Sequence, residues 1–199
     1  TLCETCYKRS KIFNSVMGNI REFKYKKIEN FLTKEQVSLM SHYCKLKHIV
    51  NKDNFDFEQS NVGDSYFYAD PAMEALMLDK KKLLEQETGL ELLPTYSFWR
   101  MYTKDGELTR HKDRPSCEIS VTVMIGSCGE SWPIYMGEKP IEMKPGDAVT
   151  YLGCDIWHER KPFKGDWHAQ SFMHYVDKNG PYADEALDKR QFFCMPGVR

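Results

Sequence analysis

The second half of the chain alternates apolar and polar residues with the two-residue period of β-strands. From Pro94 onward, short segments rich in β-branched and aromatic residues are separated by turn dipeptides such as Asp105-Gly106 and Pro145-Gly146. Many short strands with turns between them are typical of a sandwich or a barrel. The segments of this half that we expect to be strands are 95–102, 117–125, 132–137, 139–143, 147–153 and 167–176, and a further short strand is expected where "KKIENFLTKEQV" begins, before the first helix.

The first half carries two helical patterns with clear start signals. Thr33 is a good N-cap residue, and Gln36 three positions later completes a capping box. Asp70 and Pro71 open a second helix as cap and first residue, and Gly89 is a suitable C-terminal cap. The apolar faces are Val37, Met40, Tyr43 and Cys44 on the first helix and Met73, Leu76, Met77, Leu83 and Leu84 on the second.

The order of these elements predicts an α+β chain that is mainly β, with two N-terminal helices laid against a β-rich C-terminal half. A length of 199 residues fits a single domain, and we expect an N-terminal extension at 1–24 and one domain at 25–199. The connection at 51–68 is long and rich in aromatic and polar residues, so we expect it to be a lid. The tail at 182–199 is expected to form a further helix that covers the β-rich half or pairs with a second subunit, so a monomer and a homodimer both stay open.

Composition and charge narrow the class of protein. Hydrophobic residues make up 41% of the chain, charged residues make up 29%, and the net charge is -1. A nucleic-acid-binding surface is usually clearly basic, so no nucleic-acid partner is expected. No apolar run approaches the roughly 20 residues that span a bilayer, and the first residues contain no apolar signal core. We therefore expect a soluble, cytoplasmic protein with no membrane partner.

The number and spacing of the cysteines also favour the cytoplasm. Their number, seven, is odd and their spacing is irregular, which argues against a secreted disulfide framework. Cys3 and Cys6 form a CxxC pair, but a zinc site of this kind needs a second pair of ligands at a suitable spacing. No such pair follows closely, so inert thiols are the favoured interpretation.

The candidate chemistry lies at His111 and Asp113. Two side chains at positions i and i+2 of an extended segment point to the same side, so this imidazole and this carboxylate can share a metal ion. A third ligand is expected from a distant strand, and His158 follows a Pro-Gly turn and an apolar strand later in the chain. Two histidines and one carboxylate form the facial triad of non-haem Fe(II) oxygenases, which leaves positions open for other ligands. The alternative interpretation of His111 and Asp113 is an exposed turn pair.

The strand that follows this motif has two unlike faces. One face carries apolar residues and is expected to meet a core between sheets, whereas the other is polar enough to line a pocket. The apolar face is Cys117, Ile119, Val121, Val123 and Ile125, and the polar face is Glu118, Ser120, Thr122 and Met124.

These motifs identify a family. Segments 25–37 ("YKKIENFLTKEQV"), 100–113 ("RMYTKDGELTRHKD") and 144–168 ("KPGDAVTYLGCDIWHERKPFKGDWH") resemble the Fe(II)/2-oxoglutarate-dependent oxygenases, in the branch that includes prolyl 4-hydroxylases. The resemblance covers roughly residues 25–176. It implies a double-stranded β-helix (jelly roll) core with N-terminal supporting helices, and a catalytic core at about 93–177.

The resemblance also implies roles for individual residues. His111, Asp113 and His158 match the iron ligands, and Tyr102 matches a tyrosine that contacts 2-oxoglutarate in relatives. The family usually places a Lys or Arg about ten residues after the second histidine to bind the far carboxylate of 2-oxoglutarate, whereas this chain has His168 there. His168 is either a weaker anchor or a structural strand residue. Arg160 is the other candidate, because its planar fork of donors suits a carboxylate.

The implied activity is hydroxylation of a C–H bond with release of succinate and CO2, using Fe(II), 2-oxoglutarate and O2, with ascorbate as a further candidate cofactor. A prolyl or other peptidyl residue is the favoured substrate, and a small molecule is the alternative. A cupin-like metal enzyme that does not use 2-oxoglutarate is the second hypothesis, favoured by the missing Lys or Arg. The third is a jelly-roll binding module with a vestigial metal site, against which the intact motif argues.

Overall fold

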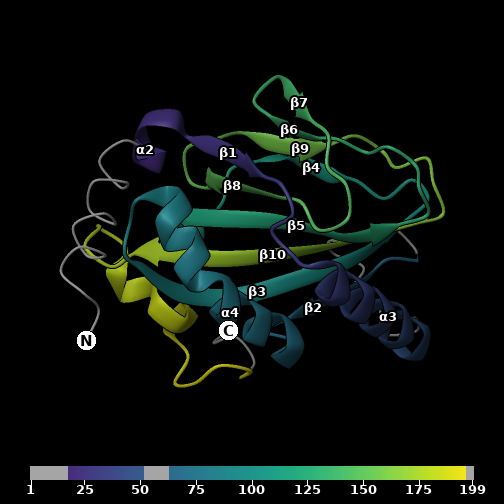
Figure 1. The fold of residues 1–199 in the computed structure, drawn as a ribbon, viewed down its shortest axis with the longest axis horizontal. Helices are drawn as coiled ribbons and strands as arrows, with labels where there is room; N and C mark the ends of the chain where they lie inside the picture. Colours follow the sequence, from purple (N-terminus) through teal and green to yellow (C-terminus); the bar gives the residue numbers. More distant parts are fainter. Residues whose placement is uncertain (1–17, 52–62, 196–199) are drawn as a thin grey trace.

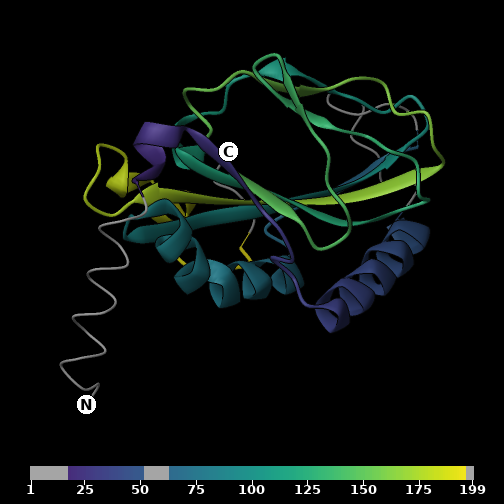
Figure 2. The ribbon, with the colours of Figure 1, turned by 45° about the horizontal axis from the view of Figure 1, so that its top comes forward.

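The computed structural model describes residues 18–51 and 63–195, in which the strands form two antiparallel sheets. The larger sheet has the strand order β1-β8-β5-β10-β3-β2, and the smaller sheet has the order β4-β9-β6-β7. The strands of the larger sheet are β1 (Tyr25–Ile28), β2 (Ser65–Tyr68), β3 (Leu92–Thr103), β5 (Ile119–Ser127), β8 (Ala148–Leu152) and β10 (Trp167–Asp177). Those of the smaller sheet are β4 (Leu108–His111), β6 (Ile134–Met136), β7 (Lys139–Ile141) and β9 (His158–Arg160). The sheets lie as two layers (Figure 1, Figure 2), which confirms the prediction of a mainly β chain.

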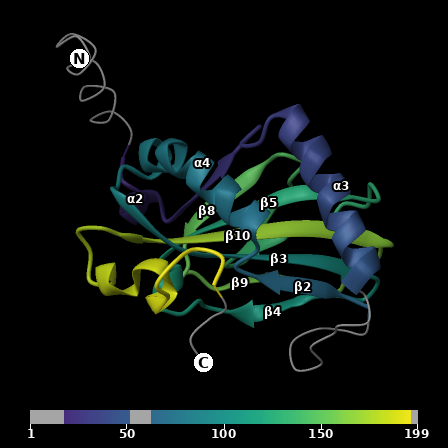
Figure 3. The same ribbon diagram turned by 90° about the horizontal axis from the view of Figure 1, so that it is seen from below.

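The two long helices begin where the capping signals predict, and the short helix α2 (Ile20–Phe23) was not expected. The long helices are α3 (Lys34–Asn51) and α4 (Pro71–Thr88), and both cover the outer face of the larger sheet (Figure 3). The Thr33 hydroxyl accepts from the Gln36 backbone N–H at 3.2 Å, and the Gln36 side chain accepts from the Thr33 N–H at 3.1 Å. Asp70 accepts from the first turn of α4, and Gly89 ends that helix in the left-handed conformation, with φ 71°. Ile20, inside the predicted extension, is fully buried.

The apolar face of β5 packs against the helices and not between the sheets, which corrects the expectation from the sequence. Its residues share one cluster with buried side chains of α3 and α4, namely Met40, Cys44, Met73, Met77 and Leu84. The space between the sheets holds a smaller aliphatic cluster around Ile134 and an aromatic cluster around Trp132. Periodicity predicts that the faces differ but not which layer each face meets, because that depends on where the helices dock. The polar face of β5 therefore turns toward the second sheet.

Three strands were missed, and one was placed too late. None of β2, β4 and β9 was expected, and β3 begins at Leu92, before Pro94. Of the predicted lid, residues 52–62 lie outside the described residues, and the end of it forms β2, which pairs with β3. The short 3-10 turn η1 (Pro115–Cys117) separates β4 from β5.

The C-terminal segment is not the regular helix that the sequence predicts. It contains a 3-10 element, η2 (Ala183–Lys189), interrupted by non-helical backbone from Ala186 to Asp188. Residues 196–199 lie outside the described part.

The five described cysteines are all free thiols, and the CxxC pair lies outside the described residues. None of the described helices combines the length and the apolar character needed to cross a membrane.

Candidate metal centre

The three predicted metal ligands come together between the sheets. His111 ends β4 and His158 begins β9, and these two residues are directly paired in the antiparallel register of the smaller sheet. Asp113 lies in the turn after β4. The motif therefore closes one strand, whereas the sequence placed it at the mouth of the next, and His158 opens a strand of its own after β8. The sheet register positions both imidazoles, and the turn positions the carboxylate.

The ligand atoms of this group converge. The Oδ1 atom of Asp113 lies 3.3 Å from Nε2 of His111 and 3.5 Å from Nε2 of His158. The two imidazole rings have centroids 4.2 Å apart, and the three ligand atoms all lie within 4.8 Å of one another. A divalent ion bound by these atoms would have two imidazole nitrogens and one carboxylate oxygen on one side, which is the donor set of the facial triad.

The tautomer of each histidine suits metal binding. His111 Nδ1 lies 2.7 Å from the carbonyl of Thr109, and His158 Nδ1 lies 3.0 Å from the carbonyl of Ile156. A carbonyl oxygen only accepts, so each Nδ1 carries the proton and donates it. In the neutral ring this leaves a lone pair on Nε2, the atom that faces Asp113, and it also fixes the ring orientation.

Asp113 is held as a carboxylate. Its backbone N–H donates to the carbonyl of Gly153 at 2.9 Å, and the Ser120 hydroxyl donates to Oδ2 at 2.9 Å. Burial opposes its ionisation, but the interactions with His111 and His158 outweigh this and hold the pKa of Asp113 well below its usual range. The same contact with Asp113 raises the pKa of His111.

A second group of possible ligands shares Asp113. Cys117 and His174 bring ligand atoms within 4.8 Å of one another and of Asp113. Burial raises the pKa of the Cys117 thiol, and a protonated thiol is a poor metal ligand. His174 lies 2.9 Å, through Nδ1, from the Ser120 hydroxyl, and burial lowers its pKa to about 4. The first group is therefore the better metal site. Ser120 contacts its carboxylate, and His174 contacts Ser120.

A buried cation lies on the same strand as His158. Arg160 is 1% exposed, its guanidinium is 4.7 Å from the centre of the Trp132 ring, and it donates to the Trp132 carbonyl. Its Nε has no hydrogen-bond partner, and Arg160 forms no ion pair with any residue in the described ranges. Burial lowers the pKa of Arg160 to about 10, so it remains a cation at neutral pH. A buried cation without an anion is costly, which marks the surroundings of Arg160 as suited to an anionic ligand.

The other two predicted cosubstrate residues lie beside the same Trp132 ring. Tyr102 is fully buried, with its ring centroid 4.8 Å from that of Trp132. The His168 ring lies 4.9 Å from the Trp132 ring, and its Nε2 is 2.8 Å from the Gln170 side-chain oxygen. Burial and the nearby Arg160 lower the pKa of His168 to about 3, and its buried Nδ1 has no partner. His168 is thus neutral, and Arg160 supplies the positive charge.

Several residues around the site were not assigned to it from the sequence. Tyr151 is buried, with its hydroxyl 3.5 Å from Nε2 of His158, and Trp132 joins the three cosubstrate candidates. Ser120 was expected to line a pocket because it lies on the polar face of β5, but its contact with Asp113 crosses the 3-10 turn and has no local signal in the sequence.

Comparison with known proteins points to one fold. No protein-family model matches the chain, and no curated protein matches it. A prolyl-4-hydroxylase from Pseudomonas putida superposes with a TM-score of 0.60 at 16% identity, covering 83% of this chain and 98% of that one. A viral collagen prolyl hydroxylase from Paramecium bursaria Chlorella virus-1, solved as its 2OG complex, gives 0.58 at 12% identity, covering 76% and 94%. The non-heme alpha ketoglutarate dependent epimerase SnoN from nogalamycin biosynthesis gives 0.64 at 10% identity, covering 96% and 93%.

At these identities the likeness establishes a shared fold. The chain has the fold of the Fe(II)/2-oxoglutarate oxygenases, with prolyl hydroxylases among its structural neighbours, so the resemblance seen in the sequence is confirmed at the level of the fold. A fold of this kind hosts more than one reaction, and the function has to be argued from the site.

Proposed function

We propose that this protein is an Fe(II)- and 2-oxoglutarate-dependent dioxygenase that hydroxylates a C–H bond, with release of succinate and CO2. The observation that carries the proposal is the set of converging Nε2, Oδ1 and Nε2 atoms of His111, Asp113 and His158, with the unpaired cation of Arg160 two residues further along the same strand. The double-stranded β-helix architecture and the domain bounds 25–199 are part of this proposal.

The donor set fits the proposed metal. His111, Asp113 and His158 would hold Fe(II), and the metal would supply the activation of O2 that no side chain can provide. The chain's own contribution is to fix the three ligands: the carbonyls of Thr109 and Ile156 hold the imidazole tautomers. Ser120 holds the carboxylate through its second oxygen, so that Oδ1 stays directed toward the histidines.

The residues around Arg160 fit the proposed cosubstrate. Arg160 would bind the far carboxylate of 2-oxoglutarate, because it is the charged member of this group and its Nε is unpartnered. The neutral His168 would contribute less to binding 2-oxoglutarate, either through a hydrogen bond or through packing. Tyr102 would contact the same ligand from β3. The aromatic rings around the guanidinium exclude water, which strengthens its attraction for a carboxylate.

The proposed substrate is a prolyl or other peptidyl residue, with a small molecule as the alternative. Two of the structural neighbours are named as prolyl hydroxylases, which supports a peptide, whereas SnoN is named as an epimerase of nogalamycin biosynthesis. Ascorbate as a further cofactor, a cytoplasmic setting and the choice between monomer and homodimer remain predictions.

The test is an anaerobic titration of the Fe(II)-loaded protein with 2-oxoglutarate, followed in the visible range. Chelation of Fe(II) by 2-oxoglutarate is expected to give a weak charge-transfer band that disappears in His158→Ala. Succinate production in air, with and without candidate proline-containing peptides, then tests turnover.

Two other outcomes would overturn the proposal. Iron binding without the band would favour a metal enzyme of the cupin type that does not use 2-oxoglutarate, the hypothesis that the neutral His168 supports. Binding of neither metal nor 2-oxoglutarate would favour a binding module with a vestigial site.

A further inference from the structure

The three proposed ligands are not held in the same way. His111 and His158 are fixed by one strand pair, whereas Asp113 lies beyond the end of β4, in a turn that is followed by only the three residues of η1. A ligand on a loop depends on neighbouring contacts for its position more than a ligand on a strand does. Gly153 and Ser120 contact Asp113 itself, and the residues after it in the turn are held by other contacts.

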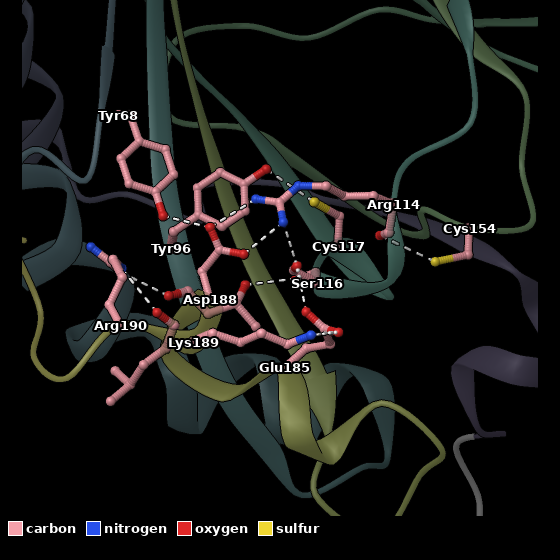
Figure 4. A network of polar contacts seen from close by, with 12 residues as sticks. Tyr68, Tyr96, Arg114, Ser116, Cys117, Cys154, Glu185, Asp188, Lys189 and Arg190 are labelled. Atoms are coloured by element: carbon pink, nitrogen blue, oxygen red, sulfur yellow. Dashed lines mark hydrogen bonds and ion pairs between the residues drawn. The ribbon is translucent and has the colours of Figure 1, made fainter. Parts of the chain in front are cut away.

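The residue after the carboxylate is clamped by the C-terminal segment, residues 183–195. Arg114 donates to both carboxylate oxygens of Asp188, at 2.7 and 2.8 Å, in the parallel two-bond geometry that is strongest for this pair (Figure 4). The Tyr68 hydroxyl donates to the same carboxylate at 2.5 Å. The Asp188 side chain is 9% exposed and the Arg114 side chain is 50% exposed, so the pair is shielded from solvent on the Asp188 side.

The same segment holds the next part of the turn. Arg114 also donates to the Ser116 hydroxyl at 2.6 Å, and that hydroxyl donates to Glu185 at 3.1 Å (Figure 4). The Thr95 hydroxyl of β3 donates to the Ser116 carbonyl at 2.7 Å. Two of the five residues from Asp113 to Cys117 are thus tied to η2.

The segment is itself anchored and strained. Arg190 is buried, with an ion pair to Glu74 of α4 at 2.6 Å and a hydrogen bond to the Thr95 carbonyl at 2.8 Å. Leu187, Asp188 and Lys189 are consecutive non-glycine residues with φ of 56°, 53° and 60°. Such backbone is unfavourable and persists only where surrounding contacts enforce it. Here it directs the Asp188 carboxylate at Arg114.

The clamp and the metal group also share an aromatic stack. The Tyr68 and Tyr96 rings are stacked with centroids 4.9 Å apart, and the Tyr96 and His174 rings lie 4.6 Å apart. His174 contacts Ser120, which contacts Asp113. The C-terminal segment therefore reaches the carboxylate both through the backbone of the turn and through this stack.

We propose that the C-terminal segment is a working part of the metal centre, with Arg114 and Asp188 as positioning residues that fix the turn bearing the Asp113 ligand. The inference rests on the proposed function in one respect, namely that His111, Asp113 and His158 bind a divalent metal. It adds that metal affinity depends on the contact of Arg114 with Asp188, a residue 75 positions after the Asp113 ligand.

The experiment measures Co(II) and Mn(II) binding to the purified full chain by calorimetry, together with the visible spectrum of the Co(II) form. The variants are Asp188→Asn, Arg114→Gln, their combination, and Tyr68→Phe, which removes one hydrogen bond to the clamp. The control is Lys178→Ala, which breaks an exposed ion pair with Glu91 outside the clamp. Thermal unfolding of each metal-free variant reports whether the fold survives.

The expected result is a loss of about tenfold or more in metal affinity for Asp188→Asn and for Arg114→Gln, as is usual when the partners of ligands are removed. The double variant should lose no more than the worse single variant, because both remove the same interaction. The Co(II) spectrum should change in the same variants, and Lys178→Ala should match the wild type. Tyr68→Phe should show the smaller loss.

Two results have separate meanings. If the wild type binds metal and Asp188→Asn binds it equally well with an unchanged Co(II) spectrum, the clamp only stabilises the fold and the inference is wrong. If the wild type itself binds neither Co(II) nor Mn(II), the proposed function fails first. A variant too unstable to purify is replaced by Tyr68→Phe, whose unchanged affinity and spectrum would also overturn the inference.

Discussion

His158 and Arg160 leave the strand β9 on the same face, so one short strand carries a proposed metal ligand and a buried cation. Both side chains are almost fully buried, whereas Trp157, before them, is 47% exposed. Residues i and i+2 of a strand are about 6.6 Å apart. A small dicarboxylate that chelates the metal at one end could therefore meet the positive charge of Arg160 at the other.

This arrangement predicts which residue anchors 2-oxoglutarate. Arg160→Ala should raise the Michaelis constant for 2-oxoglutarate by about tenfold or more, since a charged hydrogen bond contributes roughly 1.5–3 kcal/mol. His168→Ala should raise it less, because His168 is neutral and bonded to Gln170. Steady-state kinetics at varied 2-oxoglutarate measures both, and Arg160→Lys, which keeps the charge, serves as the conservative variant. A larger rise for His168→Ala would return the anchor to position 168, and no rise in either would place it elsewhere.

The metal ligands make a second prediction. His111→Ala and Asp113→Ala should each abolish iron-dependent turnover, because each removes one of the three donors of the proposed site. Metal content after dialysis and succinate release measure the two effects separately. His42→Ala, on the exposed side of α3, is the matched histidine control and should behave as the wild type. Full iron-dependent activity in either ligand variant would remove the triad from consideration.

Helix capping provides a prediction about stability alone. Thr33→Ala should lower the free energy of unfolding by about 1 kcal/mol, because it removes the acceptor for the Gln36 N–H at the start of α3. Chemical denaturation of the metal-free protein measures the change. Thr33→Ser keeps the hydroxyl and should recover most of it. A loss of metal affinity in Thr33→Ala would contradict the view that α3 only supports the outer face of the larger sheet.

Elements that are set by interactions between residues close in the sequence could be predicted, and elements that are set by distant partners could not. Thr33 with Gln36 and Asp70 with Pro71 are local signals, so both long helices were placed correctly. β2 and β4 have four residues each and are held by partners distant in the sequence, so no local pattern marks them. The alternation along β5 was correctly seen, but its apolar face meets α3 and α4, and only tertiary packing decides that.

The candidate site likewise has a part that the sequence predicts and a part that depends on long-range contacts. The motif of His111, Asp113 and His158 was readable because chemistry restricts which residue types can hold a metal. The support of Asp113 was not readable, since Ser120 reaches it across a turn and Asp188 acts through Arg114. Arg160 and His168 are equally buried beside Trp132, and only Arg160 keeps its charge there, which is likewise a property of the packed aromatic cluster.

The pairing of Asp188 with Arg114 predicts a pH dependence of stability. Burial opposes ionisation of Asp188, but hydrogen bonds from Arg114 and Tyr68 outweigh it and lower its pKa to about 2, against about 3.9 in an unfolded chain. Because the folded pKa is the lower one, Asp188 stabilises the fold fully at pH values above about 5. This contribution should be lost progressively as the pH falls from about 4 to about 2.

Comparison of the wild type with Asp188→Asn isolates this effect from the other carboxylates. The difference between their unfolding free energies should be constant from pH 7 to about pH 5 and should shrink toward pH 2, where the aspartate is protonated in the unfolded state and about half protonated in the folded state. Added salt should reduce the difference at neutral pH, because the Arg114 side chain is 50% exposed. A difference that stays constant down to pH 2 would mean that the carboxylate has no charge-dependent role in the clamp. The shape of Asp188 and its place in the strained backbone would then hold the C-terminal segment without the ion pair.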